Sequence, residues 1–480
     1  MSKSLNRRQF LGTTAAAGVA LAGCVHRIHQ TRQADIAEDE ANQWSPKLPA
    51  VKIYKVFVGR TGGIYLSRPK AEIEKFNKYL GKLEGKLNVK FVGGDLIPPA
   101  NIAQVAAKLK GADGVLLFHL SGHGGGAPAL GKLIDAGLPT AVFSQPFSGH
   151  GWMYFPAWQK AGKKVILLPS SDWGELDRVT ALMRVGPWLR QTKIIEVGGP
   201  RGTAAACNDK QVKERLGAEI VRISNGEVMK VHKAIDLKAA EAEAKEYWIS
   251  KAKKIGKPKP KEIVNSARLY LAMKELMIKH GAVATTSSHC MGAPAKGCLT
   301  YSKLNDEGLV GACEGDIDST LTMLMFQYAF GVPGFITDPV FDTATNALIH
   351  FHCTCATKMD GRAGKRLPFT IRTQSDSERG VSLDVEQRIG QVVTCAKFIN
   401  LDTMLISTGK IFKITHDELG CRTQFWTEVA DARKMFHNWG AGILKGGTMA
   451  LLHRAVFYGD RLQDIKDLSV LMGFKVVEEG

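Results

Sequence analysis

From residue 51 onward, the chain alternates between short apolar runs and longer amphipathic stretches. The runs VKIYKVFVG (51–59) and GVLLFHL (114–120) have the length and composition of buried strands, and RPKAEIEKFNKYLGKLEG (68–85) lies between them with a helical pattern. Further strand-like runs are KKVILLP (163–169) and TKIIEVGG (192–199). Strands that alternate with helices form open parallel sheets with helices on both faces. The alternation therefore predicts an α/β protein.

The pattern changes past residue 345. Strand-like runs then follow one another with little helix between them: ALIHFHCTC, PFTIRTQ, GQVVTCAKFI and TMLISTG. Successive strands of this kind favour antiparallel pairing, because short turns can join them. We therefore expect two doubly wound parallel-sheet domains at 51–162 and 163–344, followed by a mostly antiparallel, β-rich C-terminal domain at 345–480.

The N-terminal segment predicts export. NRRQFL (6–11) has the form of a twin-arginine signal, and the apolar stretch after it is too short to span a bilayer. That stretch ends in LAGC (21–24), which resembles a bacterial lipobox in which Cys24 is acylated; an ordinary cleavable signal is the alternative. We expect a twin-arginine signal peptide at 1–23 and a tether at 24–50. The protein would then lie on the periplasmic or cell-envelope side, attached to the membrane only through a lipid anchor.

The net charge of +18 does not by itself indicate a nucleic-acid-binding protein. Lysine and arginine are scattered along the chain. The one dense run, KAKKIGKPKPK (251–261), alternates Lys with Pro and contains no aromatic residue, which is typical of a solvated loop. A basic surface suits an anionic membrane or an envelope polymer better. We therefore expect no nucleic-acid partner.

Two glycine-rich turns, GHGGG (122–126) and GGPRG (198–202), each follow a predicted strand. Neither has the G-x-G-x-x-G spacing of a dinucleotide-binding fold, so a nicotinamide-dependent oxidoreductase is not supported. We interpret both as tight turns, with phosphate binding as the alternative.

Three carboxylates crowd the segment GACEGDIDSTLTML (311–324). Asp316 and Asp318 stand at the start of a predicted helix at 318–331, where carboxylates cap free N–H groups and meet the positive end of the helix dipole. Glu314 lies before the helix proper and has no capping requirement. We therefore interpret Asp316 and Asp318 as helix-starting residues and Glu314 as a functional residue.

A second functional carboxylate, Asp338, ends the run GFITD (334–338) after that helix. Strand, helix and strand in this order predict two parallel, adjacent strands, which would place Glu314 and Asp338 together at the carboxyl edge of one sheet. Two carboxylates so close repel each other unless one is protonated or a cation lies between them, and a divalent metal is the simple solution.

Histidines are the next candidates for metal ligands. In HFHCTC (350–355), His350 and His352 share one face of a strand and the two cysteines share the other, so one ion cannot bind all four without a bulge. His453 lies in an apolar run, where a core position explains a lone histidine equally well. His289, at the end of a predicted strand, could line the same pocket or belong to the core.

These residues resemble those of the L-fucose isomerase and L-arabinose isomerase superfamily, most closely its fucose-isomerase-like branch. The resemblance covers roughly residues 163–480. It is clearest in CEGDIDSTLTMLMFQY, ITDP, FHC, GQVVTCAKFI followed by LISTGK, and HRAVFYGD. Members have two α/β domains and a β-rich C-terminal domain, which agrees with the organisation predicted above.

The resemblance implies a site for Mn²⁺ or another divalent cation, held by two acidic residues and a histidine from near the C-terminus. These positions fall on Glu314, Asp338 and His453, and a further histidine of the arabinose branch would correspond to His352. The implied reaction is aldose–ketose isomerisation of a monosaccharide, in which Glu314 and Asp338 move a proton between C1 and C2 through an enediol. A homo-oligomer is also implied.

The sequence departs from the superfamily in two ways. Leu452 precedes His453 where the arabinose branch carries paired histidines, and the export signal contrasts with the mostly cytosolic members. A non-catalytic sugar-binding envelope lipoprotein is therefore the alternative function, since two doubly wound domains on a lipid anchor resemble solute-binding proteins. A metallohydrolase is a third hypothesis, which lacks a dedicated nucleophile or a phosphate cradle in the sequence.

Overall fold

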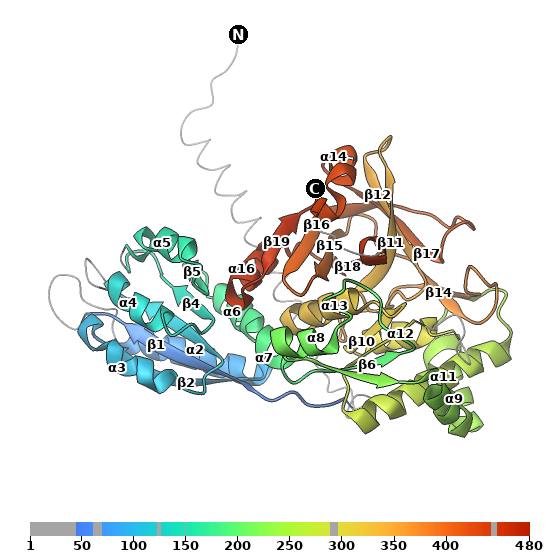
Figure 1. Ribbon diagram of the computed structural model, residues 1–480, viewed down its shortest axis with the longest axis horizontal. Coiled ribbons are helices and arrows are strands. Elements are labelled where there is room, and N and C mark those ends of the chain that lie inside the picture. Colours follow the sequence, from blue (N-terminus) through green and yellow to red (C-terminus); the bar gives the residue numbers. More distant parts are fainter. Residues whose placement is uncertain (1–44, 61–69, 122–125, 149, 289–295, 443–448) are drawn as a thin grey trace, which may run out of the picture. The chain divides into compact units, whose positions relative to one another are not determined.

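The computed structural model describes residues 45–60, 70–121, 126–148, 150–288, 296–442 and 449–480 (Figure 1). The predicted signal peptide, Cys24, most of the tether, most of the turn at 122–126 and His289 lie outside these residues. The predictions of export and of a lipid anchor therefore stay predictions. Within the described residues, no helix combines the length and the apolar character needed to cross a membrane.

The first sheet is parallel and has the strand order β2-β1-β3-β4-β5. Its strands are β1 (Val51–Val58), β2 (Val89–Ile97), β3 (Gly114–His119), β4 (Thr140–Phe143) and β5 (Val165–Leu168). β5 lies within the predicted second domain, which starts at 163, but the prediction that it belongs to the second sheet is wrong. β5 pairs with β4 and completes the first sheet, since the segment between them folds into the short helix α5 (Phe155–Lys160) and returns the chain to the same sheet.

The first sheet is covered on both faces because its strands alternate two sets of apolar side chains. Val56 and Leu117 share a core with α3 (Ala103–Ala106) and α4 (Gly126–Ile134). On the other face, Phe57 and Phe118 stack on each other and contact Phe76 of α2 (Lys70–Leu87). The predicted doubly wound arrangement is therefore present in this sheet.

The second sheet is also parallel and has the order β10-β9-β6-β7. Its strands are β6 (Lys193–Val197), β7 (Glu219–Ile223), β9 (Ala284–Ser287) and β10 (Val310–Cys313). The helices of this region are α6 (Gly174–Met183), α7 (Val185–Leu189), α8 (Asp209–Leu216), α9 (Asn225–Ala234), α10 (Leu237–Glu243), α11 (Pro260–His280), α12 (Cys298–Asp306) and α13 (Ile317–Phe330). A π-helical turn, η5 (Ala244–Ile249), extends α10.

The C-terminal region forms an antiparallel, barrel-like sheet in the order β15-β18-β11-β12-β17-β16, closed by pairing of β15 with β16. Its strands are β11 (Phe335–Asp342), β12 (Ala347–His352), β15 (Val392–Ile399), β16 (Thr403–Ile414), β17 (Thr423–Glu428) and β18 (Arg454–Tyr458), with β19 (Lys475–Glu478) parallel to β16. A small sheet joins β8 (Lys254–Ile255), β13 (Phe369–Arg372) and β14 (Ser382–Val385). The helices are α14 (Ala432–Asn438), α15 (Met449–Leu452) and α16 (Leu462–Met472).

The prediction that the strands on either side of α13 lie side by side in one sheet is wrong. β10 belongs to the second parallel sheet, whereas β11 pairs antiparallel with β12 and β18 in the barrel. The cause is α13, which is buried on nearly every side and contacts β10 as well as β15 and β18 (Figure 1). A helix that is apolar all round packs between two layers, so it carries the chain from one sheet to the other.

The fold class is confirmed at the level of its sheets: two parallel sheets precede an antiparallel β region. That region begins with β11 at Phe335, ten residues before the predicted boundary at 345 (345 − 335). The predicted division into three domains stays a prediction.

Candidate functional site

Four of the predicted site residues lie together where the second parallel sheet meets the barrel. Glu314 follows β10, Asp338 lies within β11, His352 ends β12, and His453 directly precedes β18. His352 Nε2 lies 3.8 Å from Glu314 Oε1 and 3.8 Å from Asp338 Oδ2. His453 Nε2 lies 3.7 Å from Glu314 Oε2 and 3.3 Å from Asp338 Oδ1. The two carboxylates therefore converge as predicted, although Asp338 comes from a barrel strand and does not end it.

The backbone turns sharply at Glu314. Its φ is +61° and that of Gly315 is +72°. A non-glycine residue in this left-handed region costs on the order of 1 kcal/mol, and such strain persists where the surroundings fix it. A Cβ on Gly315 would lie 2.9 Å from the carbonyl oxygen of Gly199, so the neighbouring loop leaves room only for glycine.

Asp316 both caps α13 and orients His453. Its carboxylate accepts hydrogen bonds from the backbone N–H of Ser319 at 2.9 Å, as the sequence predicts for an N-cap. It also accepts from His453 Nδ1 at 2.8 Å and from Lys397 Nζ at 2.7 Å. Lys397 and His453 are fully buried. Since Nδ1 is committed to Asp316, the Nε2 atom of His453 faces Asp338 and Glu314.

These contacts control protonation in the cluster. Burial alone would lower the pKa of His453, but the bond to Asp316 and the nearby Asp338 carboxylate raise it to about 9. Burial would raise the pKa of Asp316, but Lys397 and His453 hold it well below its usual range. His352 and His453 likewise outweigh burial and lower the pKa of Asp338. At neutral pH the cluster thus holds ionised carboxylates beside an imidazolium.

Asp318 lies in the first turn of α13, as predicted, but its carboxylate bonds to a neighbouring loop. It accepts from the hydroxyl of Thr203 at 2.7 Å and from the backbone N–H of the same residue. Burial and the adjacent Asp316 raise the pKa of Asp318 to about 7. Asp318 therefore ties the loop after β6 to the start of α13.

The backbone of His453 is held by a buried ion pair. The Nη1 atom of Arg454 donates to the carbonyl of His453 at 2.8 Å, while Nη2 lies 2.5 Å from Glu479 Oε1. Both charged side chains are fully buried, and the guanidinium stacks over the ring of Trp439 at 3.8 Å. This arrangement fixes the point at which the chain enters β18.

The donor set fits a divalent cation. One ligand atom each from Asp338, His352 and His453 lie within 4.8 Å of one another, and so do those of Cys313, Glu314 and His352. In the described part of the chain, Asp338 Oδ1 and His453 Nε2 are buried and lie 3.3 Å apart, and neither makes a hydrogen bond of good geometry with the other or with another group. Buried polar atoms without partners are costly, and coordination of an ion would satisfy them.

The other residues of HFHCTC do not join this cluster. His350 is fully buried, with Nδ1 at 3.1 Å from the hydroxyl of Thr337 and Nε2 at 3.0 Å from that of Thr427. Burial lowers its pKa to about 3. His350 is thus a core residue, and Cys313 rather than Cys353 or Cys355 offers a sulfur to the cluster.

The turn GGPRG (198–202) also belongs to the site. Arg201 N donates to the carbonyl of Gly315 at 2.7 Å, and Ile317 N donates to the carbonyl of Arg201 at 3.0 Å. These bonds place Arg201 Nη1 3.9 Å from Glu314 Oε2. From its sequence this segment is interpreted as a tight turn, with phosphate binding as the alternative, so its place beside Glu314 is not predicted. The sequence feature that could have indicated its role in the site is its position after β6, at the same carboxyl edge of the sheet that carries Glu314.

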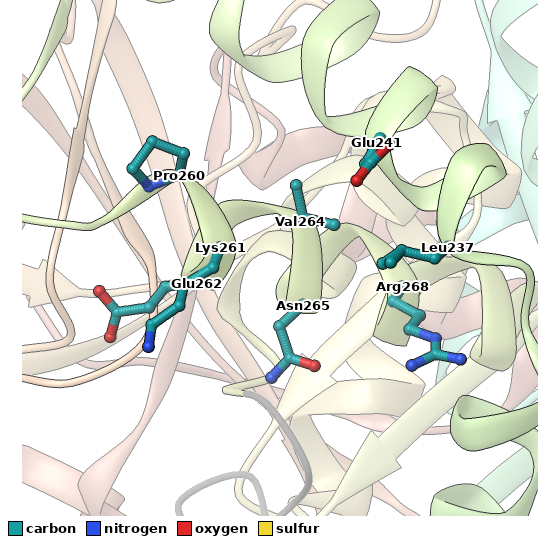
Figure 2. A pocket seen from close by; sticks show the side chains of 8 residues that line it. All are labelled: Leu237, Glu241, Pro260, Lys261, Glu262, Val264, Asn265 and Arg268. Carbon is teal, nitrogen blue, oxygen red and sulfur yellow. The ribbon is translucent and has the colours of Figure 1, made fainter.

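A separate hollow lies between α10 and α11 and contains none of the clustered residues (Figure 2). It is lined by Leu237, Glu241, Pro260, Lys261, Glu262, Val264, Asn265 and Arg268. Figure 2 shows these side chains along the flanks of two helices, without converging acidic or imidazole groups. The acidic and imidazole groups that converge are therefore those of the cluster formed by Glu314, Asp338, His352 and His453.

Part of this chain is similar to a known sugar isomerase. The sulfoquinovose isomerase of Clostridium sp. (strain MSTE9) is 33% identical over 97 residues, which cover 18% of this chain and 21% of that protein. The match thus spans about a fifth of the length of this relative. No family model matches the chain. The similarity agrees with the predicted enzyme class at this coarse level.

Proposed function

We propose that this protein is a metal-dependent aldose–ketose isomerase that acts on a monosaccharide. The observation that carries the proposal is the convergence of Glu314, Asp338 and His453, which three separate elements bring together. The similarity to a sulfoquinovose isomerase supports the same class of reaction. The site therefore combines a place for a hard cation with two carboxylates that can exchange protons.

Glu314, Asp338 and His453 would hold the cation, with His352 beside them. Carboxylate and imidazole ligands suit Mn²⁺. When bound, the cation would polarise the carbonyl and the adjacent hydroxyl of the sugar. The metal and its identity belong to the proposal.

The carboxylates carry the proton transfers. One of the pair Glu314 and Asp338 removes the proton from C2 of the open-chain aldose and delivers it to C1 of the enediol. The other moves the proton between the two oxygens, so that the hydroxyl and the carbonyl exchange places. Side-chain exposures of 29% for Glu314 and 20% for Asp338 leave both carboxylates accessible to a ligand, whereas His453 is fully buried.

The name of the relative makes sulfoquinovose the first substrate to test. A panel should also contain common neutral aldoses, each with added Mn²⁺. We expect at least one member to be interconverted with its ketose.

The pair Asp338→Asn and Asp342→Asn tests the assignment. Both residues lie on β11, but Asp342 is remote from the cluster and bonds to Thr345 in a turn. We expect Asp338→Asn to abolish turnover and weaken Mn²⁺ binding, while Asp342→Asn behaves as the wild type. Full turnover in Asp338→Asn would refute the assignment. Sugar binding without turnover in the wild type would instead indicate the non-catalytic sugar-binding protein.

A further inference from the structure

We propose that Arg201 binds an anionic substituent of the substrate, so that the natural substrate is a negatively charged monosaccharide. This inference rests on the proposed function and names the substrate class of the same site.

The guanidinium of Arg201 is available to a ligand. Its side chain is 46% exposed, and its nearest carboxylate oxygen among the described residues is Glu314 Oε2 at 3.9 Å. By contrast, Arg222, on the neighbouring β7, is committed to Asp209 at 2.7 Å and Glu196 at 2.9 Å. Within the described part of the chain, the Arg201 guanidinium makes no comparable short contact. Its fork of N–H donors can therefore take a planar or tetrahedral oxyanion in two parallel hydrogen bonds.

The loop holds the backbone of Arg201 in place before any ligand arrives. The backbone of Arg201 is bonded on both sides, to Gly315 at 2.7 Å and to Ile317 at 3.0 Å. The next residue, Gly202, has a φ of +129°, and a Cβ there would lie 2.4 Å from Asp318 Oδ2. A donor on a fixed backbone loses less conformational entropy on binding, which favours a binding role.

The charge of the loaded site calls for an anion. Glu314 and Asp338 together carry two negative charges, which a divalent cation would balance. The charge of Lys397 is balanced by Asp316 at 2.7 Å. Arg201 would then be a positive charge near a bound cation, because its nearest carboxylate, Glu314 at 3.9 Å, would be shared with that cation, and like charges at short range repel each other. A sulfonate, phosphate or carboxylate on the sugar would remove this repulsion.

The test compares Arg201→Gln and Arg201→Lys with the matched control Arg215→Gln. Arg215 is similarly exposed, at 50%, and lies 3.7 Å from Asp402, away from the cluster. The substrates are glucose and its charged counterparts sulfoquinovose, glucose 6-phosphate and glucuronate, which separate the three kinds of anion. We expect the wild type to prefer one charged sugar. Arg201→Gln should raise KM for that sugar about 10- to 100-fold, the range for hydrogen bonds to charged groups.

Several results separate this role from a structural one. We expect Arg201→Gln to lose more of its kcat/KM on the charged sugar than on glucose, Arg201→Lys to be intermediate on the charged sugar, and Arg215→Gln to match the wild type. Equal losses on neutral and charged sugars, or a wild type without preference for a charged sugar, would overturn the proposal and leave the isomerase assignment intact.

Calorimetry gives a readout that does not need turnover. The metal-free wild type should bind the preferred charged sugar more tightly than Arg201→Gln does. Mn²⁺ affinity should be equal or higher in Arg201→Gln, because a neighbouring cation has been removed. If no sugar is isomerised, the proposed function fails, and calorimetry alone decides the role of Arg201. The proposed role of Arg201 would be overturned if the charged sugars bound the wild type and Arg201→Gln equally, or bound neither protein.

Discussion

Asp316→Asn, compared with a double variant that also replaces Lys397, separates the positioning of His453 from the stability of the fold. The asparagine can still accept the hydrogen bond from Ser319 N, so the cap of α13 is retained. It removes the negative charge that faces Lys397 at 2.7 Å and His453 Nδ1 at 2.8 Å. The perturbation acts on the buried ion pair and on the orientation of one imidazole, and also on the bond that the Ser319 hydroxyl donates to the same carboxylate oxygen and on the pKa of Asp318.

The stability cost follows from the burial of Lys397. Its side chain is fully buried, and within the described residues Asp316 is its one ion-pair partner. Removing one partner of a buried pair costs about 3–5 kcal/mol, because the remaining charge stays desolvated. The cost in metal affinity is separate: loss of the carboxylate that orients a metal-binding histidine typically weakens binding about 10- to 100-fold.

The double variant Asp316→Asn with Lys397→Met distinguishes the two costs. Removing both charges should restore most of the melting temperature, since an apolar side chain of similar size replaces a buried ion pair at little cost. Mn²⁺ affinity, measured by calorimetry and corrected for the proton that His453 releases on binding, should stay as low as in Asp316→Asn alone. Lys397→Met alone is the matched control, because it keeps the bond from His453 to Asp316. Affinity within twofold of the wild type in the double variant would refute the positioning role.

Three further outcomes follow from the same structure. Because the pKa of His453 is raised to about 9, its imidazole is protonated at neutral pH in the metal-free protein. Calorimetry in buffers of different ionisation enthalpy should therefore show that Mn²⁺ binding releases about one proton. The affinity for Mn²⁺ should rise about tenfold per pH unit between pH 6 and 8.5. The same raised pKa stabilises the metal-free fold fully below pH 6.5, and the melting temperature should fall as pH rises towards about 9. Gly202→Ala should lower the free energy of unfolding by about 1–3 kcal/mol, because the new side chain strains the backbone and clashes with Asp318. Gly137 also has a positive φ, +77°, but open space surrounds it. Chemical denaturation should therefore show a clearly smaller loss of stability in Gly137→Ala.

The strands of both parallel sheets were predictable because short apolar runs bounded by glycine, proline and polar residues seldom form anything other than buried strands. β1, β3 and β6 begin and end within two residues of the predicted runs. The sheet to which each strand belongs was less predictable. The sequence around β5 gives no sign that this strand returns to the first sheet, since pairing depends on contacts far along the chain.

The segment from β10 to β11 shows the same limit in a more informative way. Strand, helix and strand predict neighbours in one sheet, but α13 has almost no polar face. That feature was visible in the sequence and indicates a helix buried between layers. A helix of this kind between two strands indicates that the strands belong to different layers, which contradicts the prediction that they are adjacent.

The candidate site was only partly predictable. Glu314, Asp338 and His453 were singled out from strand ends and from the family resemblance, and the structure brings them together. Asp316 and Lys397 were not predicted as partners of His453. Helix capping alone explains an aspartate at position 316, so the sequence provides no reason to expect a second role for it. Lys397, the lone lysine in the apolar run GQVVTCAKFI, was the feature that indicated a buried charge in need of a partner.

The central claim is that Glu314, Asp338 and His453 form one metal-dependent isomerase site. The most direct measurement is a titration of metal-free protein with Mn²⁺, in which aldose–ketose interconversion is followed by NMR in parallel with metal binding. We expect no turnover without metal, activity that rises until one Mn²⁺ is bound per chain, and loss of both binding and turnover in Glu314→Gln. Turnover in the metal-free protein, or a Glu314→Gln variant that keeps both, would contradict it.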